Sequence, residues 1–309
     1  MSNLLNTFFN SPYLLLTLAP LSWGGNAVAG RLAADNWLPF TFTSIRWAFV
    51  VLLLVPFVYK QVWQERRVLL SSALVLFALG GLGLGMFNMG MYLALNYTSA
   101  LNVSVEQAAM PMTILFFNYI LLRQRVLWQQ IVGLCFAVLG VILTATRGDP
   151  LALLQSGINR GDAIMIGSCL LYSAYSVGLR WKPAISWHSF IFALSVSAFL
   201  VSIPFSFFET SRYGFPPVGG SDIAILIYVV LFPSILAQLC FARGVELIGA
   251  NRAGQFINLV PIFGALLAVL ILSEAFHWYH AAGLLAVFGG IALAERSTRR
   301  SAASTQKSG

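Results

Sequence analysis

The chain has 309 residues, of which 59% are hydrophobic and only 9% are charged, and its formal net charge is +8. Soluble domains carry about 25% charged residues, so this composition excludes a soluble globular fold. The basic residues are scattered between hydrophobic runs, which argues against nucleic-acid binding and is typical of membrane topology signals. The three cysteines lie inside apolar runs, with neither the number nor the spacing of a disulfide framework or a metal site.

Apolar runs of about 20 residues recur along the whole chain, each long enough to cross a bilayer core of about 30 Å. They predict an all-α membrane protein of ten transmembrane helices. The first run lacks the basic region of a cleaved signal peptide, so we expect it to be retained. In chain order the predicted spans are residues 12–30, 39–59, 68–95, 102–122, 128–146, 161–181, 187–208, 222–245, 251–273 and 278–295.

The Lys and Arg residues predict the orientation of these spans. If the N-terminus is cytoplasmic, most of them fall on the inner side. The outer side then receives Arg31, Arg147, Arg160 and Arg212. This positive-inside bias places both termini in the cytoplasm of a multi-pass protein of the cell membrane, the inner membrane in a bacterium. Residues 297–309 are rich in Ser, Ala, Lys and Arg, and we expect a disordered cytoplasmic tail there.

An internal repeat divides the chain. Pro111 and Pro261 share a gapless frame, which also pairs Gly133 with Gly283 and Gly140 with Gly290. With small shifts the frame extends upstream to pair Asn88 with Gln238. It predicts two five-span repeats, residues 1–147 and 148–296. An odd number of spans per repeat inverts the second copy, and inverted repeats build alternating-access transporters.

The two prolines lie inside apolar runs, near the predicted midplane of the membrane. A proline within a helix frees a carbonyl group and kinks the backbone, which a membrane helix tolerates only where neighbours or a cavity satisfy that group. Two interpretations stay open for Pro111 and Pro261. They form packing kinks, or they form hinges or walls of a substrate cavity.

Glu106 is the carboxylate well inside a predicted span, and Arg46 lies at a similar depth on the second span. A buried carboxylate is costly, so it usually pairs, protonates or faces water. Three interpretations stay open. Glu106 and Arg46 form a structural ion pair, Glu106 is hydrated near the interface, or Glu106 faces the cavity as a proton-coupling or amine-binding group.

Uncharged polar residues within the spans complete the predicted substrate cavity. Amides in a membrane either bond between helices or line a cavity. Tyrosines supply amphipathic cavity walls, or they serve packing and the interface belts. These candidates are Asn26, Asn88, Gln238, Gln255, Asn258, Tyr92, Tyr172 and Tyr175.

Several motifs carry a family resemblance. They are Trp23-Gly24-Gly25-Asn26, Arg46 in the second span, the stretch from Ala94 to Ala100 running on to Pro111, and Leu272-Ser273-Glu274 followed by Gly283. Together they resemble the drug/metabolite transporter superfamily, specifically its ten-span EamA-type branch. The resemblance implies ten helices around a central cavity lined mostly by spans 1, 3, 4, 6, 8 and 9. It also implies transport of small organic solutes, amino acids prominent among them.

One departure from that family is visible. Gln124 stands where the family has a glutamate after the fourth span, at the position matching Glu274. We therefore expect Glu274 to cap or anchor a helix end rather than to act in the transport mechanism.

These observations favour a secondary transporter that exports amino acids or related neutral or zwitterionic metabolites. No Walker loop is present in the sequence, so a gradient of substrate or protons would supply the energy. Export of cationic drugs is the alternative, with Glu106 as its support; an intramembrane enzyme or a channel is less favoured. We expect no cofactor and no metal, and the partners are a small-molecule substrate and the lipid bilayer. A monomer is compatible with the sequence.

Overall fold

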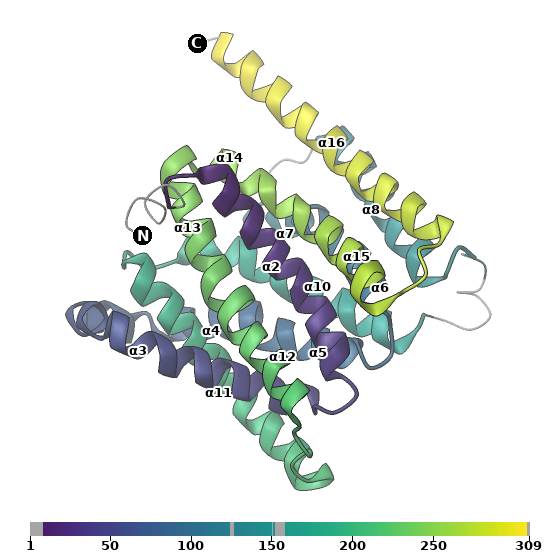
Figure 1. Cartoon of the computed structure of the whole chain (residues 1–309). Helices are drawn as coiled ribbons and strands as arrows, with labels where there is room; N and C mark the ends of the chain where they lie inside the picture. Colours follow the sequence, from purple (N-terminus) through teal and green to yellow (C-terminus); the bar gives the residue numbers. More distant parts are fainter. Residues whose placement is uncertain (1–8, 124–126, 150, 152–157, 308–309) are drawn as a thin grey trace.

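The computed structural model describes residues 9–123, 127–149, 151 and 158–307, and within them every regular element is helical (Figure 1). The helices and helical turns are α2 (Pro12–Ala33), α3 (Pro39–Ser71), α4 (Ala73–Gly80), η1 (Gly81–Met86), α5 (Phe87–Ala94), α6 (Ala100–Ala108), α7 (Met110–Leu122), α8 (Trp128–Ala145), α10 (Arg160–Gly178), η2 (Leu179–Trp181), α11 (Trp187–Tyr213), α12 (Gly220–Leu231), η3 (Phe232–Leu236), α13 (Ala237–Ile248), α14 (Ala250–Gly254), η4 (Gln255–Asn258), α15 (Leu259–Leu272) and α16 (Trp278–Lys307).

A helix or a series of helices lies over each predicted span. Among the described residues, seven helical stretches are long and apolar enough to cross a membrane, and the bent pair α6 and α7 raises this number to eight. Helix α2 and the shorter apolar stretch Trp278–Leu293 cover the first and last predicted ranges. The structure therefore confirms an all-helical membrane protein, whereas the count of ten spans and the orientation of the termini stay predictions.

The C-terminal segment differs from the expectation. Helix α16 continues to Lys307, so the backbone is helical through most of the segment for which the sequence indicated a disordered tail. The segment extends a helix that the apolar stretch Trp278–Leu293 has already started, and adding turns to an existing helix is easier than starting a new one. In Figure 1 this end of α16 projects away from the other helices.

Helices α3 and α11 lie side by side and run antiparallel (Figure 1). Near the C-terminus of α11, the Glu209 carboxylate accepts hydrogen bonds from the backbone N–H groups of Phe40 and Thr41, at 3.3 and 2.8 Å. Near the other end, Glu65 of α3 accepts bonds from the backbone N–H and the hydroxyl of Ser186, both at 3.0 Å. Each helix thus supplies a carboxylate that satisfies free N–H groups at the start of its partner.

Helices α8 and α16 form a second antiparallel pair, held at close range by glycines. A Cβ atom at Gly140 would meet the carbonyl oxygen of Gly283, and one at Gly290 would meet that of Gly133, both too close for any side chain. The repeat frame matches Gly133 with Gly283 and Gly140 with Gly290, and each contact joins one glycine of the first pair to one of the second. Close approach of small residues is a common way for membrane helices to pack.

Several spans are interrupted near their middle. The span of α4 and α5 contains the π-helical η1, and the span of α12 and α13 contains the π-helical η3. The α6–α7 span bends by 42°, and η4 is a 3-10 segment ahead of α15. Irregular helical turns of this kind often accompany functional sites.

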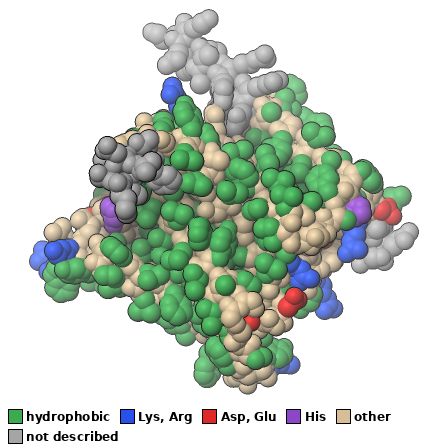
Figure 2. All heavy atoms as spheres, in the orientation of Figure 1, with side chains coloured by type: hydrophobic (Ala, Val, Ile, Leu, Met, Phe, Trp, Pro, Cys, Tyr) green, Lys and Arg blue, Asp and Glu red, His purple; other side chains and the backbone are tan. Residues whose placement is uncertain are grey.

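The surface agrees with a lipid environment. Figure 2 shows hydrophobic side chains over much of the visible face, while the charged side chains gather toward its periphery. Large apolar residues such as Phe57, Leu74 and Leu285 are exposed on the helices. In water such a surface would promote aggregation, whereas in a bilayer it contacts lipid tails.

Candidate functional site

The interrupted helices surround a central cavity of about 430 Å³. Both halves of the chain contribute to its wall. The lining residues are Trp23, Asn26, Arg46, Trp47, Gly83, Leu84, Phe87, Asn88, Met91, Gln107, Ala108, Met110, Pro111, Ile114, Tyr172, Tyr175, Ser176, Leu179, Trp187, Pro233, Gln238, Phe241, Ile257, Asn258, Val260, Pro261 and Phe288.

The repeated prolines and amides reach this cavity from both halves. Pro111, Pro261, Asn88 and Gln238 all line it. Pro111 lies in the first turn of α7 and Pro261 in the first turn of α15. Proline is tolerated there because an N–H group in the first turn of a helix has no intrahelical partner. The prolines therefore mark points where broken helices resume, rather than kinks within continuous ones.

The other predicted cavity residues divide into two groups. Asn26, Tyr172, Tyr175 and Asn258 line the cavity, whereas Tyr92, Glu106 and Gln255 are not part of its wall. Gln107 lines it instead of Glu106, its neighbour in α6. Because successive helical residues point about 100° apart, sequence alone could not choose between these two.

Arg46 enters the deep part of the cavity wall from α3, and its hydrogen bonds to described residues all go to neutral groups. Its Nε donates to Ser234 Oγ at 2.9 Å, and its Nη1 donates to Asn88 Oδ1 at 2.8 Å and to Asn26 Oδ1 at 3.1 Å. Nη1 also donates to the Tyr92 hydroxyl, which in turn donates to Asn26 Oδ1 at 2.8 Å. Side chains from α2, α5 and η3 thus hold the guanidinium group that α3 supplies.

The predicted ion pair between Arg46 and Glu106 is not formed. Glu106 is only 1% exposed, so its side chain is not hydrated at the surface, and neither carboxylate oxygen has a hydrogen-bond partner among the described residues. Its carboxyl group lies near that of Asp162 at the start of α10. Asp162 accepts a hydrogen bond from Thr98. The two side chains of the predicted pair point to different neighbours, although the sequence predicts similar depths for them.

A second hollow, of about 520 Å³, lies at the ends of α2 and α8 and includes Arg31, Arg147 and Glu274. The two Glu274 oxygens accept hydrogen bonds from Ala100 N at 2.9 Å and Leu101 N at 2.8 Å, at the start of α6. The expectation that Glu274 caps a helix end is confirmed. The matching position, residue 124, lies outside the described residues.

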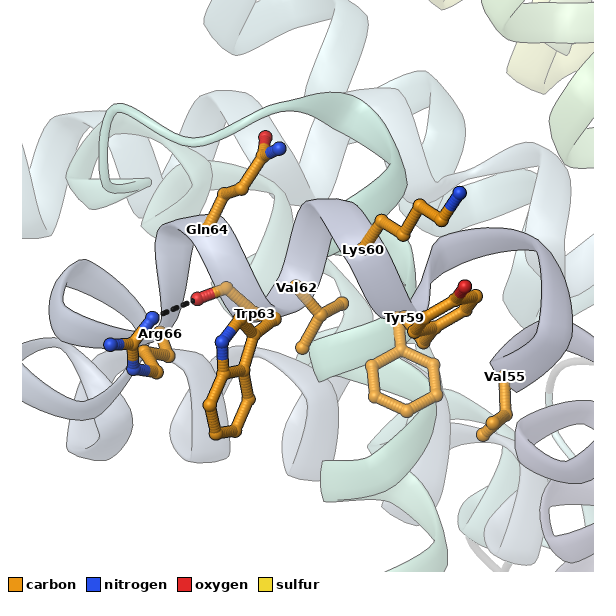
Figure 3. Close-up of a pocket in the computed structure, with 8 residues that line it drawn as sticks. Val55, Tyr59, Lys60, Val62, Trp63, Gln64 and Arg66 are labelled. Atoms are coloured by element: carbon orange, nitrogen blue, oxygen red, sulfur yellow. Dashed lines mark hydrogen bonds between the residues drawn. The ribbon is translucent and has the colours of Figure 1, made fainter.

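A third hollow, of about 640 Å³, lies on the surface along the C-terminal half of α3 (Figure 3). It combines the exposed rings of Tyr59 and Trp63 with the cationic side chains of Lys60 and Arg66. The Arg66 guanidinium lies 4.5 Å from the centroid of the Trp63 ring, and Nη1 donates to the Trp63 carbonyl oxygen at 2.7 Å. Aromatic and basic residues together are typical of a membrane–water interface, so this hollow fits a boundary with lipid headgroups better than a solute site.

The fold defines a polytopic helical membrane protein, and its central cavity is lined by residues of both halves of the chain. The model of the EamA-like transporter family matches residues 10–146 and 159–295. The chain belongs to this family, and its family places it among membrane transporters rather than enzymes.

Several bacterial transporters are similar over most of their length. The uncharacterized transporter YetK of Bacillus subtilis is 25% identical, covering 90% of this chain and 85% of that protein. YdeK of the same organism is 29% identical over 89% and 94%, and the uncharacterized inner membrane transporter YicL of Salmonella typhimurium is 23% identical over 94% and 96%. A crystal structure at 18% identity, covering 94% of this chain and 98% of its own, superposes with a TM-score of 0.58, which supports the fold.

Proposed function

We propose that the protein is a secondary active transporter that moves small organic metabolites through the central cavity by alternating access. Its cargo would be amino acids or related neutral or zwitterionic solutes, exported across the cell membrane. The observation that carries this proposal is that Pro111 and Pro261, and Asn88 and Gln238, bring matching positions of both halves to one cavity. Transporters bind solutes between repeats at interrupted helices. A volume of about 430 Å³ suits a metabolite.

Inversion of the second repeat is part of this proposal. It is supported by the antiparallel pairs α3 with α11 and α8 with α16, each of which joins corresponding spans of the two halves. An inverted pair of units can exchange conformations across a membrane and so open the same site to either side. Cytoplasmic termini follow if the positive-inside bias of the sequence holds.

The described conformation suits loading from the predicted cytoplasmic side. Trp187 and Leu179, where α11 begins and α10 ends, line the cavity and are each 36% exposed. Asn26, Asn88 and Arg46, at the opposite end of the cavity, are buried. The cavity thus reaches the surface at the end that carries Lys182 and Arg180 in the predicted topology.

The energy source is a gradient of substrate or of protons. Glu106 is our candidate for a proton carrier, because it is a buried carboxyl group beside a second one, Asp162, and none of the described basic side chains forms a salt bridge with it. Export of cationic drugs is less favoured, because Glu106, the carboxylate that would bind a cation, is not part of the cavity wall.

Counterflow in proteoliposomes tests the transport proposal. Vesicles preloaded with an unlabelled mixture of amino acids and other organic acids should accelerate uptake of a labelled member, which marks a carrier. Flux that does not saturate would instead mark a channel, and no flux of any solute would contradict the proposal. Ser176→Trp fills the cavity and should block exchange. The matched control Leu170→Trp lies on an exposed face of the same helix and should not.

A further inference from the structure

The guanidinium of Arg46 is a buried cation without a protein counter-charge. The residue is 3% exposed, and the salt bridge formed among the described residues is a different one, between Arg243 and Glu246. The groups that bond to Arg46, namely Asn26, Asn88, Tyr92 and Ser234, are neutral. A charged side chain inside a membrane protein is expensive, and it usually pairs with an opposite charge or lines a functional pathway.

The unused edge of this guanidinium belongs to the cavity wall. Nε and Nη1 make the hydrogen bonds to protein, whereas Nη2 makes none to any described residue. Nη2 is also not among the described buried polar atoms that lack a partner, so it is not sealed off from the cavity that Arg46 lines. Two nitrogens are thus committed to positioning the group, and one donor edge remains for a ligand.

The charge of the cavity wall determines which ligand charge it favours. Among the described lining residues Arg46 is the charged one, and the wall contains no Asp, Glu, Lys or His. A solute with one carboxylate would neutralise the site through charge-assisted hydrogen bonds, for which guanidinium and carboxylate have matching geometry. An ammonium group would find no carboxylate in this wall and would be repelled by Arg46.

The rest of the wall selects an apolar body. The Arg46 guanidinium lies 5.1 Å from the centroid of the Trp47 ring. Phe87, Tyr172 and Tyr175 continue the aromatic wall, with ring centroids 5.0 and 5.3 Å apart along the series. A solute entering past the exposed Trp187 would meet aromatic rings first and the cation at the far end.

We propose that Arg46 binds the carboxylate of the transported solute, and that the preferred substrates are amphipathic organic monocarboxylates with an apolar or aromatic body. This inference rests on the proposed transport function and revises its substrate class, from neutral or zwitterionic solutes to solutes with a net negative charge. An amino acid can bind through its carboxylate, but the described wall contains no carboxylate that would bind its ammonium group.

Wild-type protein provides the first test, with matched probes that differ only in charge. 3-Phenylpropionate, indole-3-acetate and hexanoate should raise the thermal midpoint of the purified protein and inhibit counterflow. Their primary amides, which keep the shape without the charge, should bind at least about tenfold more weakly, because a charge-assisted hydrogen bond is roughly twice as strong as a neutral one. Phenethylamine should show no binding, and phenylalanine should bind no better than 3-phenylpropionate.

Variants at the site provide the second test. Arg46→Lys keeps the charge and should keep a reduced preference for acid over amide, whereas Arg46→Gln should abolish the preference. Arg243→Gln removes an exposed arginine paired with Glu246 and should leave the preference unchanged. If Arg46→Gln does not fold, the wild-type comparison and Arg46→Lys still decide.

Three outcomes separate this inference from the function on which it rests. Equal binding of acids and amides by the wild type would overturn the role of Arg46, while saturable exchange of amides or amines would leave transport intact. A preference for acids that persists in folded Arg46→Gln would also overturn it. Absence of saturable exchange for every probe would count against the transport proposal itself, and absence of binding in the thermal assay as well would end the inference.

Discussion

Replacing Glu274 with alanine should destabilise the protein by about 3 kcal/mol. Its carboxylate accepts bonds from Ala100 N and Leu101 N at 2.9 and 2.8 Å. Hydrogen bonds to an ionised group contribute about 1.5–3 kcal/mol each, and a negative charge at a helix N-terminus adds about 0.3–1 kcal/mol. The half-buried position of Glu274 reduces the sum through solvent screening. Ala100 and Leu101 are themselves buried, so water replaces the lost acceptor poorly.

Thermal unfolding of the purified protein in detergent measures this effect. For large domains about 1 kcal/mol corresponds to about 2 °C, so Glu274→Ala should lower the midpoint by about 6 °C. Glu274→Gln keeps one acceptor oxygen and should lose about half as much. The control is Glu246→Ala, which removes a side chain that is 65% exposed and paired with Arg243. An exposed pair of this kind contributes about 0.2–1 kcal/mol.

The comparison between the two alanine variants decides the matter. Equal midpoints for Glu274→Ala and Glu246→Ala would show that the cap contributes no more than a surface ion pair, and the reasoning would be refuted. Loss of transport at an unchanged midpoint would also refute it, because Glu274 would then act in the mechanism rather than in holding the start of α6.

Three further predictions concern the packing, the buried carboxyl group and the broken helix. Gly290→Ala should lower stability by about 1–3 kcal/mol, because the added Cβ would clash with the backbone of α8. The neighbouring Gly289→Ala is the control, because a Cβ there meets nothing within 4 Å and should leave stability unchanged. Equal thermal midpoints for the two variants would contradict this prediction. Glu106→Gln should fold normally and abolish the response of solute flux to an imposed pH gradient, because an amide cannot carry a proton; an unchanged response in vesicles would remove Glu106 from the coupling mechanism. Pro111→Ala should slow counterflow severalfold by allowing α6 to continue into α7, and flux at the wild-type rate would exclude a hinge role.

The all-helical membrane architecture and the places of the two repeated prolines could be predicted because their signals are local. Apolar length, the repeat frame and the prolines are properties of short stretches, and the prolines indeed lie where α7 and α15 begin. The helix cap formed by Glu274 could also be predicted from the sequence, since a carboxylate without a counterpart in the other repeat suggested an anchoring role.

The partners of Arg46 and Glu106 could not be predicted in this way. The position of a residue along a span sets its depth, at 1.5 Å per residue, and both side chains are therefore placed at comparable levels. Whether they meet depends on the rotation of each helix about its axis and on the helices that lie between them. In the structure Arg46 points to Asn26 and Asn88, whereas Glu106 points toward α10 and Asp162.

The sequence by itself determined that this protein is an all-helical membrane protein and that its two halves are related, because hydrophobic length and periodicity act within each segment. Tertiary structure alone decided which polar groups share the cavity. It directed Gln107 rather than Glu106 into the wall, and it left Arg46 there without a counter-charge. The reason is geometric: neighbouring residues on a helix point about 100° apart, so only the packing of several helices decides which face meets the cavity.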